Sequence, residues 1–210
     1  YDRDEVETGL TFAGFVLLTT AVKPQSAATL RTLQETGHDV IMITGDNVNT
    51  AACVARELGI VGTAVQLVAG AGDGAWAWCD MEGIEVAPYD PARDVTAVLA
   101  ELAGLDARDV CLTGESLAML RATAPPAFAD AVFARTRVFA RMTPAQKEDV
   151  VATYQRLGKT VLMCGDGTND VGALKRADVG VAILNTLPSE REIRATEAIQ
   201  LGLVPMPSFT

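Results

Sequence analysis

Short runs of apolar residues alternate with longer stretches of helical spacing along most of this sequence, and no other feature constrains the fold as strongly. The runs Val40–Ile43 and Thr160–Met163 are each followed by a turn containing Gly and Asp, and then by a helical stretch. A run that is apolar on both faces is typical of a parallel strand that helices cover on both sides. The sequence therefore predicts an α/β fold with a mainly parallel sheet between helices.

The same pattern gives the position of each expected element. We expect strands at Phe12–Leu18, Val40–Ile43, Val110–Thr113, Thr160–Met163 and Val179–Leu184, and helices at Gln25–Glu35, Asn47–Leu58, Pro91–Ala103, Thr143–Leu157 and Asn169–Ala177. Pro24 comes just before the first of these helices, and Gly37, Gly59 and Gly158 stand where three of them should end. The stretch Glu190–Thr210 has a helical start and a proline-containing end, so we expect it to be loosely ordered.

The middle of the chain departs from this alternation. Trp76 and Trp78 are spaced as on one face of a strand, and Glu82-Gly83 provides a turn. The stretch Gln66–Pro88 therefore predicts a small hairpin whose tryptophans pack against the main sheet. We interpret the wider stretch 66–107 as a variable insertion.

Charge and composition disfavour several classes of function. The 27 acidic residues exceed the 17 basic ones and give a net charge of −10, which argues against nucleic acid and anionic membrane surfaces as partners. The longest apolar stretch, Leu10–Val22, contains three threonines and is too short to span a bilayer. The four cysteines form no C-x-x-C pair, so we expect reduced and mostly buried thiols. The single histidine, His38, is expected in a hydrogen-bonded loop.

The segment Cys164–Asp170 carries the strongest indication of a site. It reads C-G-D-G-T-N-D, after an apolar run and before a helical stretch. In open α/β sheets, ligands bind beyond the carboxyl ends of the strands. Asp166 and Asp170 supply oxygen ligands of the kind that Mg²⁺ prefers, beside the amide of Asn169. An ordinary helix start would also favour Asp and Asn, but two acids, an Asn and two glycines this close together favour a site.

A second segment, Thr44-Gly45-Asp46-Asn47, occupies the equivalent position after Val40–Ile43. A hydroxyl, a glycine amide and a helix N-terminus can together bind an anion. Capping of the next helix by Asp46 or Asn47 would explain the same residues, so alone this segment is weaker evidence than Cys164–Asp170.

A third segment places a lysine at a helix start. Thr143-Pro144-Ala145-Gln146 predicts a capping box with proline at the first helical position. Lys147 then falls in the first turn, where the helix dipole disfavours a cation. A surface lysine is the usual explanation for any lysine, but this unfavourable position favours a role facing phosphate.

The three segments together offer a hydroxyl and amides, a cation and two carboxylates, which is a set that can stabilise a transferring phosphoryl group. Such a reaction also needs a nucleophile or a positioned water. The only D-x-D in the chain, Asp2-Arg3-Asp4, does not follow an apolar run, and we reject it. The predicted site is therefore incomplete.

These segments resemble the haloacid dehalogenase superfamily, and within it the phosphorylation domain of P-type ATPases. Met42–Asn47 is similar to the T-G-D loop of that family, Phe139–Lys147 to the segment with its lysine, and Gly165–Asp170 to its G-D-G-x-N-D motif. The resemblance covers most of residues 8–185 and is weakest over 66–107. It implies a Rossmann-like, haloacid dehalogenase-like fold with a small hairpin insertion.

The particular residues of these segments resemble one branch of the P-type ATPases more than the others. Met163–Lys175 is closest to the type-V, subtype-A branch, and Leu10–Phe15, Lys23-Pro24 and Phe209-Thr210 also resemble it. The resemblance implies a phosphoprotein at the cytosolic face of the endoplasmic reticulum membrane. Its transport cargo would be transmembrane segments of misplaced proteins, although older naming calls the branch cation-transporting.

The resemblance also implies a role for each matching residue. Catalytic contacts to the phosphoryl group would come from Thr44, Gly45, Lys147 and Asp170, contacts to ATP from Asp46, Arg141 and Asn169, and ligands to Mg²⁺ from Asp166 and Asp170.

The D-K-T-G-T segment of the family, whose aspartate is phosphorylated from ATP, does not occur in this sequence. We therefore expect residues 1–188 to be part of a phosphorylation domain and 189–210 to lead toward a membrane helix. The chain alone would be inactive, its partners being the nucleotide-binding, actuator and membrane domains of the same transporter. Two alternatives remain: a free-standing phosphatase of the superfamily, and a non-catalytic module that binds phosphate or magnesium.

Overall fold

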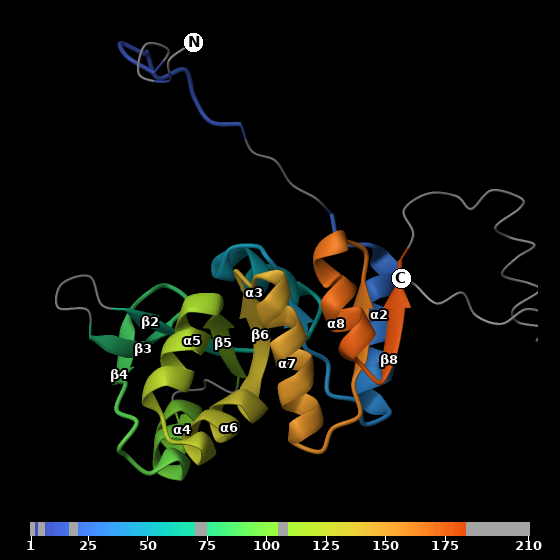
Figure 1. Ribbon diagram of the computed structural model, residues 1–210. Helices are drawn as coiled ribbons and strands as arrows, with labels where there is room; N and C mark the ends of the chain where they lie inside the picture. Colours follow the sequence, from blue (N-terminus) through green and yellow to red (C-terminus); the bar gives the residue numbers. More distant parts are fainter. Residues whose placement is uncertain (1–2, 4–6, 17–20, 70–74, 105–108, 184–210) are drawn as a thin grey trace, which may run out of the picture.

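The computed structural model describes residues 3, 7–16, 21–69, 75–104 and 109–183 (Figure 1). Its helices are α2 (Pro24–Glu35), α3 (Val48–Glu57), α4 (Val95–Gly104), α5 (Gly114–Thr123), α6 (Pro126–Arg135), α7 (Pro144–Arg156) and α8 (Val171–Arg176), with the short 3-10 helix η1 (Thr168–Asp170) before the last. Its strands are β1 (Met42–Ile43), β2 (Ala64–Ala69), β3 (Trp76–Asp80), β4 (Glu85–Pro88), β5 (Asp109–Thr113), β6 (Thr136–Ala140), β7 (Leu162–Gly165) and β8 (Val179–Ala182). The predicted α/β fold is confirmed.

The strands form two sheets. Six of them join in the order β1-β6-β5-β2-β3-β4, in which β1, β6, β5 and β2 are parallel and β3 and β4 add an antiparallel meander. The strands β7 and β8 form a separate parallel pair. Because parallel strands place their carboxyl ends at the same edge, the segments that follow β1, β6 and β5 are neighbours at one edge of the large sheet.

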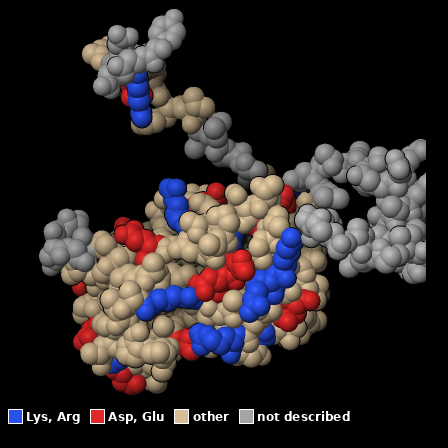
Figure 2. Space-filling model, in the orientation of Figure 1, with Lys and Arg blue, Asp and Glu red and all other residues tan. Residues whose placement is uncertain are grey.

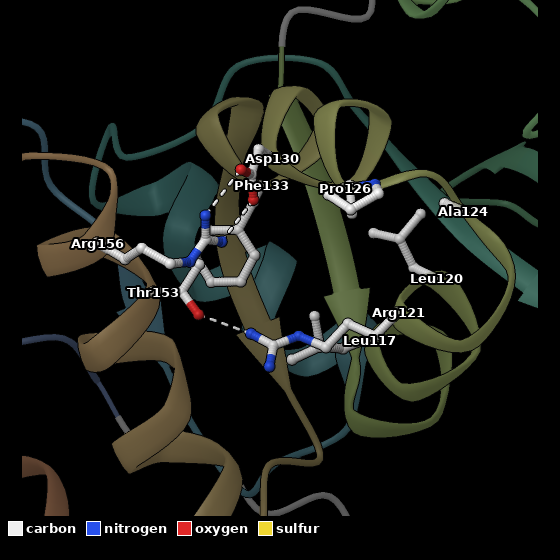
Figure 3. A pocket seen from close by; sticks show the side chains of 10 residues that line it. Leu117, Leu120, Arg121, Ala124, Pro126, Asp130, Phe133, Thr153 and Arg156 are labelled. Carbon is white, nitrogen blue, oxygen red and sulfur yellow. Dashed lines mark hydrogen bonds and ion pairs between the residues drawn. The ribbon is translucent and has the colours of Figure 1, made fainter.

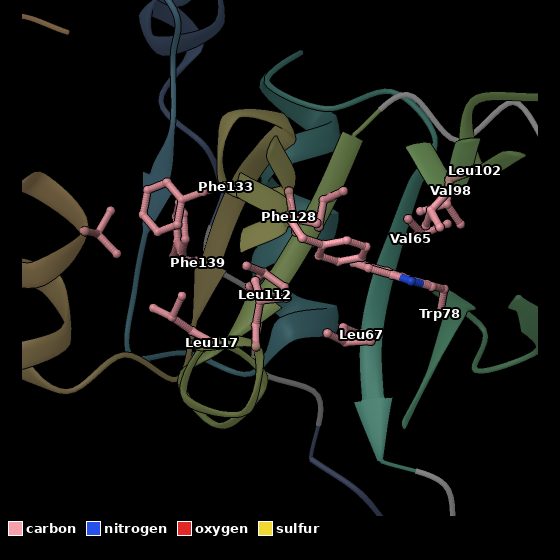
Figure 4. Packing of buried hydrophobic residues seen from close by; sticks show 14 of the residues in the cluster. Val65, Leu67, Trp78, Val98, Leu102, Leu112, Leu117, Phe128, Phe133 and Phe139 are labelled. Carbon is pink, nitrogen blue, oxygen red and sulfur yellow. The ribbon is translucent and has the colours of Figure 1, made fainter. Parts of the chain in front are cut away.

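Apolar side chains pack on both faces of the large sheet. Leu112 of β5 and Phe139 of β6 belong to one cluster, which they share with side chains of α4, α5, α6 and α7 (Figure 4). Cys111 and Val138, the preceding residues of the same strands, belong to a second cluster with the alanines of α3. Successive residues of a strand point to opposite faces. The helices therefore cover both faces, as the sequence predicts.

The signals for helix ends are confirmed. The side chain of Asn47 accepts a hydrogen bond at the start of α3, and Thr143 forms the predicted capping box at the start of α7. Gly37, Gly59 and Gly158 follow α2, α3 and α7 with φ values of 87°, 71° and 79°. Glycine adopts this left-handed conformation without the steric cost that other residues carry.

The predicted hairpin is also present, as β3 and β4 joined by a short turn. Trp78 of β3 is fully buried in the first cluster, and Trp76 packs against that cluster. The tryptophans therefore attach the hairpin to the helices on one face of the sheet. The hairpin extends the large sheet rather than forming a separate unit.

The predicted strand Phe12–Leu18 is wrong over the residues that the structure describes. Residues 12–16 belong to no strand, and the side chains of Phe12 and Phe15 are 74% and 94% exposed. Residues 17 and 18 lie outside the described ranges. An apolar run forms a strand only where a neighbour pairs with its backbone, and residues 12–16 have no such neighbour in the described part of the chain.

Two other strands are less central than predicted. β1 is shorter than Val40–Ile43 and lies at the edge of the large sheet rather than inside it. β7 begins two residues later than predicted, at Leu162, and is only partly buried, because its one neighbour among the described strands is β8. Helix α4 begins at Val95 rather than Pro91, since Asp94 accepts hydrogen bonds from the first amides of the helix.

Four elements have no counterpart in the prediction: β2, α5, α6 and β6. β6 matters most, because it lies between β1 and β5 and leads directly into the segment before Lys147. Its first residues, Thr136 and Arg137, are polar, which hides the strand in the sequence pattern. The predicted ends at Leu184 and Glu190–Thr210 lie outside the described residues.

The prediction that the cysteines are mostly buried is only half correct. Cys79 and Cys111 are buried, whereas Cys53 and Cys164 are exposed. His38 lies in the expected loop, where its Nδ1 contacts Thr36 Oγ1 at 3.1 Å. None of the helices in the described ranges combines the length and the apolar content that crossing a bilayer requires.

Candidate functional site

The site is organised around a buried ion pair between Lys147 and Asp170. The Nζ of Lys147 lies 2.7 Å from Oδ1 of Asp170, and the two residues are only 8% and 7% exposed. They come from two different elements, since Lys147 belongs to α7 and Asp170 to η1. Charged residues are seldom buried unless they are paired, so this contact is the main polar feature inside the fold.

Helix α7 presents Lys147 in its first turn. Thr143 caps the helix and Pro144 occupies its first position, so that the Lys147 amide donates to the Thr143 carbonyl at 3.0 Å. A cation at this end of a helix is disfavoured by the helix dipole. The carboxylate of Asp170 offsets that cost, and the unfavourable position noted in the sequence is thereby explained.

The loop between β7 and α8 folds back on itself to hold Asp170. The second carboxylate oxygen of Asp170 accepts a hydrogen bond from the Gly167 amide at 3.2 Å. A side chain at Gly165 would begin 2.7 Å from the Cβ of Asp170, which is closer than real atoms approach, so only glycine fits there. The two glycines of the predicted motif thus serve to bring Asp170 against its own loop.

Burial of Asp170 would raise the pKa of its carboxyl group. The hydrogen bonds from Lys147 and from the Gly167 amide outweigh that effect, and the pKa of Asp170 is lower than usual. Asp170 is therefore ionised at neutral pH, and it holds the ammonium group of Lys147 in place.

The loops after β1 and β6 are joined by backbone hydrogen bonds. The Met142 amide donates to the Thr44 carbonyl and the Arg141 amide to the Asp46 carbonyl, each at 3.0 Å. Arg141 has a φ of 53°, which makes it the one non-glycine residue with positive φ among the described residues. This conformation is uncommon for a residue with a side chain and is often found at functional sites. The hydroxyl of Thr44 accepts from the Asp46 amide at 3.1 Å.

The structure thus brings the backbone of Thr44–Asp46 against the segment that leads into Lys147, and Lys147 against Asp170. The side chains of Asp46, Arg141, Asp166 and Asn169 are exposed, and Gly45 is exposed as well. Among the described side chains, no three or more His, Cys, Asp or Glu residues are grouped so that they could hold a metal ion. Any metal here would depend on Asp166 and Asp170 together with ligands that the described side chains do not supply.

Two residues beside the site were missed by the sequence prediction. Gln146 was predicted only as part of the capping box, and Gly114 was not singled out. The side-chain amide of Gln146 donates to the Gly114 carbonyl at 2.8 Å, across from α7 to the start of α5. A signal was present, because Thr113-Gly114 follows a strand in the same way as Thr44-Gly45. Had the neighbouring positions of β5 and β6 in the sheet been known, this signal would have placed Gly114 next to the segment that leads into Lys147.

A hollow of about 230 Å³ lies elsewhere, between α5, α6 and α7 (Figure 3). Two arginines at its rim are already paired: Arg121 with Asp149 and Thr153, and Arg156 with both oxygens of Asp130. Positive and negative side chains alternate over this face of the molecule (Figure 2). Because the guanidinium groups are neutralised by carboxylates, the hollow is not an anion site.

Comparisons with known proteins agree with the motifs. A family model for haloacid dehalogenase-like hydrolases matches residues 1–75 and 70–178. The chain is 43% identical over 185 residues to the Probable manganese-transporting ATPase of Arabidopsis thaliana, a match that covers 88% of this chain and 15% of the relative. It is 41% identical over 187 residues to the endoplasmic reticulum transmembrane helix translocase of Saccharomyces cerevisiae, with 88% and 15% covered.

A third relative is the polyamine-transporting ATPase of Mus musculus, which is 37% identical over 189 residues, with 86% of this chain and 16% of the relative covered. The chain thus spans only about 15% of the length of the relatives that it matches first. The relatives are P-type ATPases, and the translocase is of the endoplasmic reticulum, so the resemblance predicted from the motifs is confirmed.

Proposed function

The chain belongs to the haloacid dehalogenase-like hydrolase family, and we propose that it is the part of a P-type ATPase that holds the phosphoryl group during formation of an aspartyl-phosphate. The observation that carries this proposal is the buried pair of Lys147 and Asp170 at the edge where the segments after β1, β6 and β7 meet. A buried cation fixed by a carboxylate is preorganised to meet negative charge.

The residues of the site have different roles in this proposal. Lys147 neutralises the oxygens of the phosphoryl group, while Asp170 fixes the position of its ammonium group. The hydroxyl of Thr44 and the amide of Gly45 bind the same oxygens, since they lie at the end of β1 beside the Lys147 segment. Asp46, Arg141 and Asn169, whose side chains are exposed, face the nucleotide.

Magnesium fits the residues of the loop after β7. The Asp166 carboxylate is exposed and forms no ion pair with any described residue, and carboxylate oxygens are suitable ligands for Mg²⁺. Asp166 and Asp170 would hold the ion, and when bound it would neutralise part of the phosphoryl charge. We expect weak binding that depends on Asp166, because Mg²⁺ usually relies on phosphate oxygens as well as on carboxylates.

The nucleophilic aspartate would come from a strand outside this sequence. β1 pairs only with β6, and β7 only with β8, within the described strands. Ile43 of β1 nevertheless packs against the cluster that contains Met163 of β7. Each strand thus has an edge open to pairing, and a further parallel strand could supply the aspartate between them. This arrangement supports the proposal that the chain does not form an aspartyl-phosphate by itself.

The rest of the proposal concerns the longer protein. Residues 1–188 would be part of its phosphorylation domain, with 66–107 as an insertion and 189–210 leading to a membrane helix. Nucleotide-binding, actuator and membrane domains would be its partners, at the cytosolic face of the endoplasmic reticulum membrane. The endoplasmic reticulum translocases among the relatives support this location. Their names give a transmembrane helix as the cargo, and we propose the same cargo for the longer protein.

Incubation of the 210-residue chain with γ-labelled ATP and Mg²⁺, followed by acid quench and gel electrophoresis, tests the missing nucleophile. We expect no label on the chain, because the D-K-T-G-T segment that carries the phosphorylated aspartate does not occur in this sequence. Label that survives the acid quench would contradict the proposal and would favour a free-standing phosphatase of the same family.

A further inference from the structure

The segment that leads into Lys147 is tied to its neighbours on both sides. On the β1 side, the amides of Arg141 and Met142 donate to the carbonyls of Asp46 and Thr44. On the β5 side, the one hydrogen bond from this segment to the start of α5 among the described residues comes from the side chain of Gln146, whose Nε2 donates to the Gly114 carbonyl at 2.8 Å. Since β6 lies between β1 and β5 in the sheet, the two sets of bonds hold the start of α7 from opposite directions.

The fit around Gln146 is tight. A Cβ atom at Gly114 would lie 2.6 Å from Oε1 of Gln146 and 2.8 Å from the carbonyl oxygen of Arg141. Gly114 has no positive φ, so space rather than backbone conformation excludes a side chain there. The start of α5 therefore packs directly against the residue that precedes Lys147.

The side chain of Gln146 forms two kinds of contact at once. Its Oε1 accepts from the Thr143 amide at 3.0 Å, which completes the capping box, and its Nε2 makes the bond to Gly114. A glutamate would serve the first contact equally well, since capping boxes use either residue. Only an amide can also donate to a carbonyl. The second contact is therefore specific to glutamine.

We infer that Gln146 is a positioning residue for Lys147: its bond to Gly114 sets the start of α7 so that the ammonium group of Lys147 reaches Asp170. The adjacent side chain of Lys147 must cross from α7 to the loop after β7 to form the 2.7 Å ion pair. Without the bond to Gly114, the hydrogen bonds that residues 141–146 make to neighbouring strands and loops, within the described part of the chain, are those on the β1 side. The importance of Gln146 for phosphoryl transfer rests on the proposed function, whereas its effect on the placement of the Lys147 ammonium group does not.

Competitive labelling of amines with acetic anhydride tests the inference on the whole chain. The side chain of Lys147 is 10% exposed, whereas that of Lys159, which pairs with Asp39, is 59% exposed and serves as the internal reference. Mass spectrometry gives the ratio of labelling at the two lysines. In Gln146→Glu, which keeps the cap but loses the donor to Gly114, we expect this ratio to rise by about fivefold, the change that corresponds to loss of one hydrogen bond.

Two further variants complete the design. Gly114→Ala should raise the ratio similarly, because the added Cβ displaces the Gln146 side chain from the other side of the same contact. Gln155→Ala is the matched control: this glutamine lies on the same helix and its Nε2 also donates to a backbone carbonyl, that of Arg176, at 3.0 Å. Its ratio should equal that of the unchanged chain.

A Gln146→Glu ratio equal to that of the unchanged chain would overturn the inference and leave the residue as a cap only. An equal rise in Gln155→Ala would also overturn it, because general loosening of α7 would then explain the result. Circular dichroism verifies that each variant is folded before labelling. The outcome is independent of ATP, so a failure of the proposed function would leave the labelling result intact.

Discussion

Replacing Lys147 by methionine removes the cation of the buried pair while keeping most of the apolar side chain. Asp170, 7% exposed, would then keep only the hydrogen bonds from its own loop. Removing one partner of a buried ion pair typically costs about 3–5 kcal/mol, and relief of a cation from the helix N-terminus returns about 0.3–1 kcal/mol. We therefore expect Lys147→Met to lower the free energy of unfolding by about 2–4 kcal/mol, less than in a fully enclosed site.

Urea unfolding at neutral pH measures this loss, with Lys159→Met as the control. Lys159 pairs with Asp39 at 3.3 Å, but their side chains are 59% and 50% exposed, and an exposed pair is worth only about 0–1 kcal/mol. If both variants lose the same stability, within about 0.5 kcal/mol, the pair is not a buried structural contact and our reasoning about it is wrong.

The same pair should make the stability depend on pH. The pKa of Asp170 is lower in the folded chain than usual, so its contribution is complete above its unfolded value of about 4 and is lost as pH falls through the folded-state pKa. The difference between the unchanged chain and Lys147→Met should therefore shrink as the pH is lowered below about 4. A difference that stays constant or grows over this range would contradict the assignment of the ion pair.

Two further predictions concern packing and thiol exposure. Gly180→Ala should destabilise the β7–β8 pair by about 1–3 kcal/mol, since its Cβ would collide with the Leu174 carbonyl. In the control Gly62→Ala, the added Cβ meets no atom within 4 Å, so this variant should be nearly neutral. Equal melting temperatures of the two variants would refute this prediction. Cys164 is exposed, whereas burial raises the pKa of Cys111 to about 12, so a maleimide at neutral pH should modify Cys164 before Cys111 in the native chain. Equal rates at these two thiols by mass spectrometry would show that β5 is not buried.

Local signals in the sequence predicted the fold class and the helix ends. Asn47, Thr143, Gly59 and Gly158 act through hydrogen bonds and backbone conformations within a few residues, so their roles can be inferred from neighbours in sequence. The capping box that places Lys147 in the first turn of α7 is of this kind, and it is confirmed.

Contacts between distant segments could not be predicted in the same way. Phe12–Leu18 has the composition of a strand, yet residues 12–16 form none, since pairing depends on a partner that the pattern does not reveal. That Lys147 pairs with Asp170 rather than Asp166 depends on how the loop after β7 folds around Gly165. Gln146 was predicted as a cap, but its bond to Gly114 follows only once β5 is known to lie beside β6.

The most direct test of the proposed function is phosphorylation of the longer protein that contains this sequence. Membranes carrying that protein are incubated with γ-labelled ATP and Mg²⁺, and the acid-stable label is compared between the unchanged protein, Lys147→Ala and Lys159→Ala. We predict label on the unchanged protein and on Lys159→Ala, and a loss of about tenfold or more for Lys147→Ala, since a buried cation at the phosphoryl group contributes to its transfer. Equal labelling of Lys147→Ala and the unchanged protein would contradict the claim that Lys147 holds the phosphoryl group.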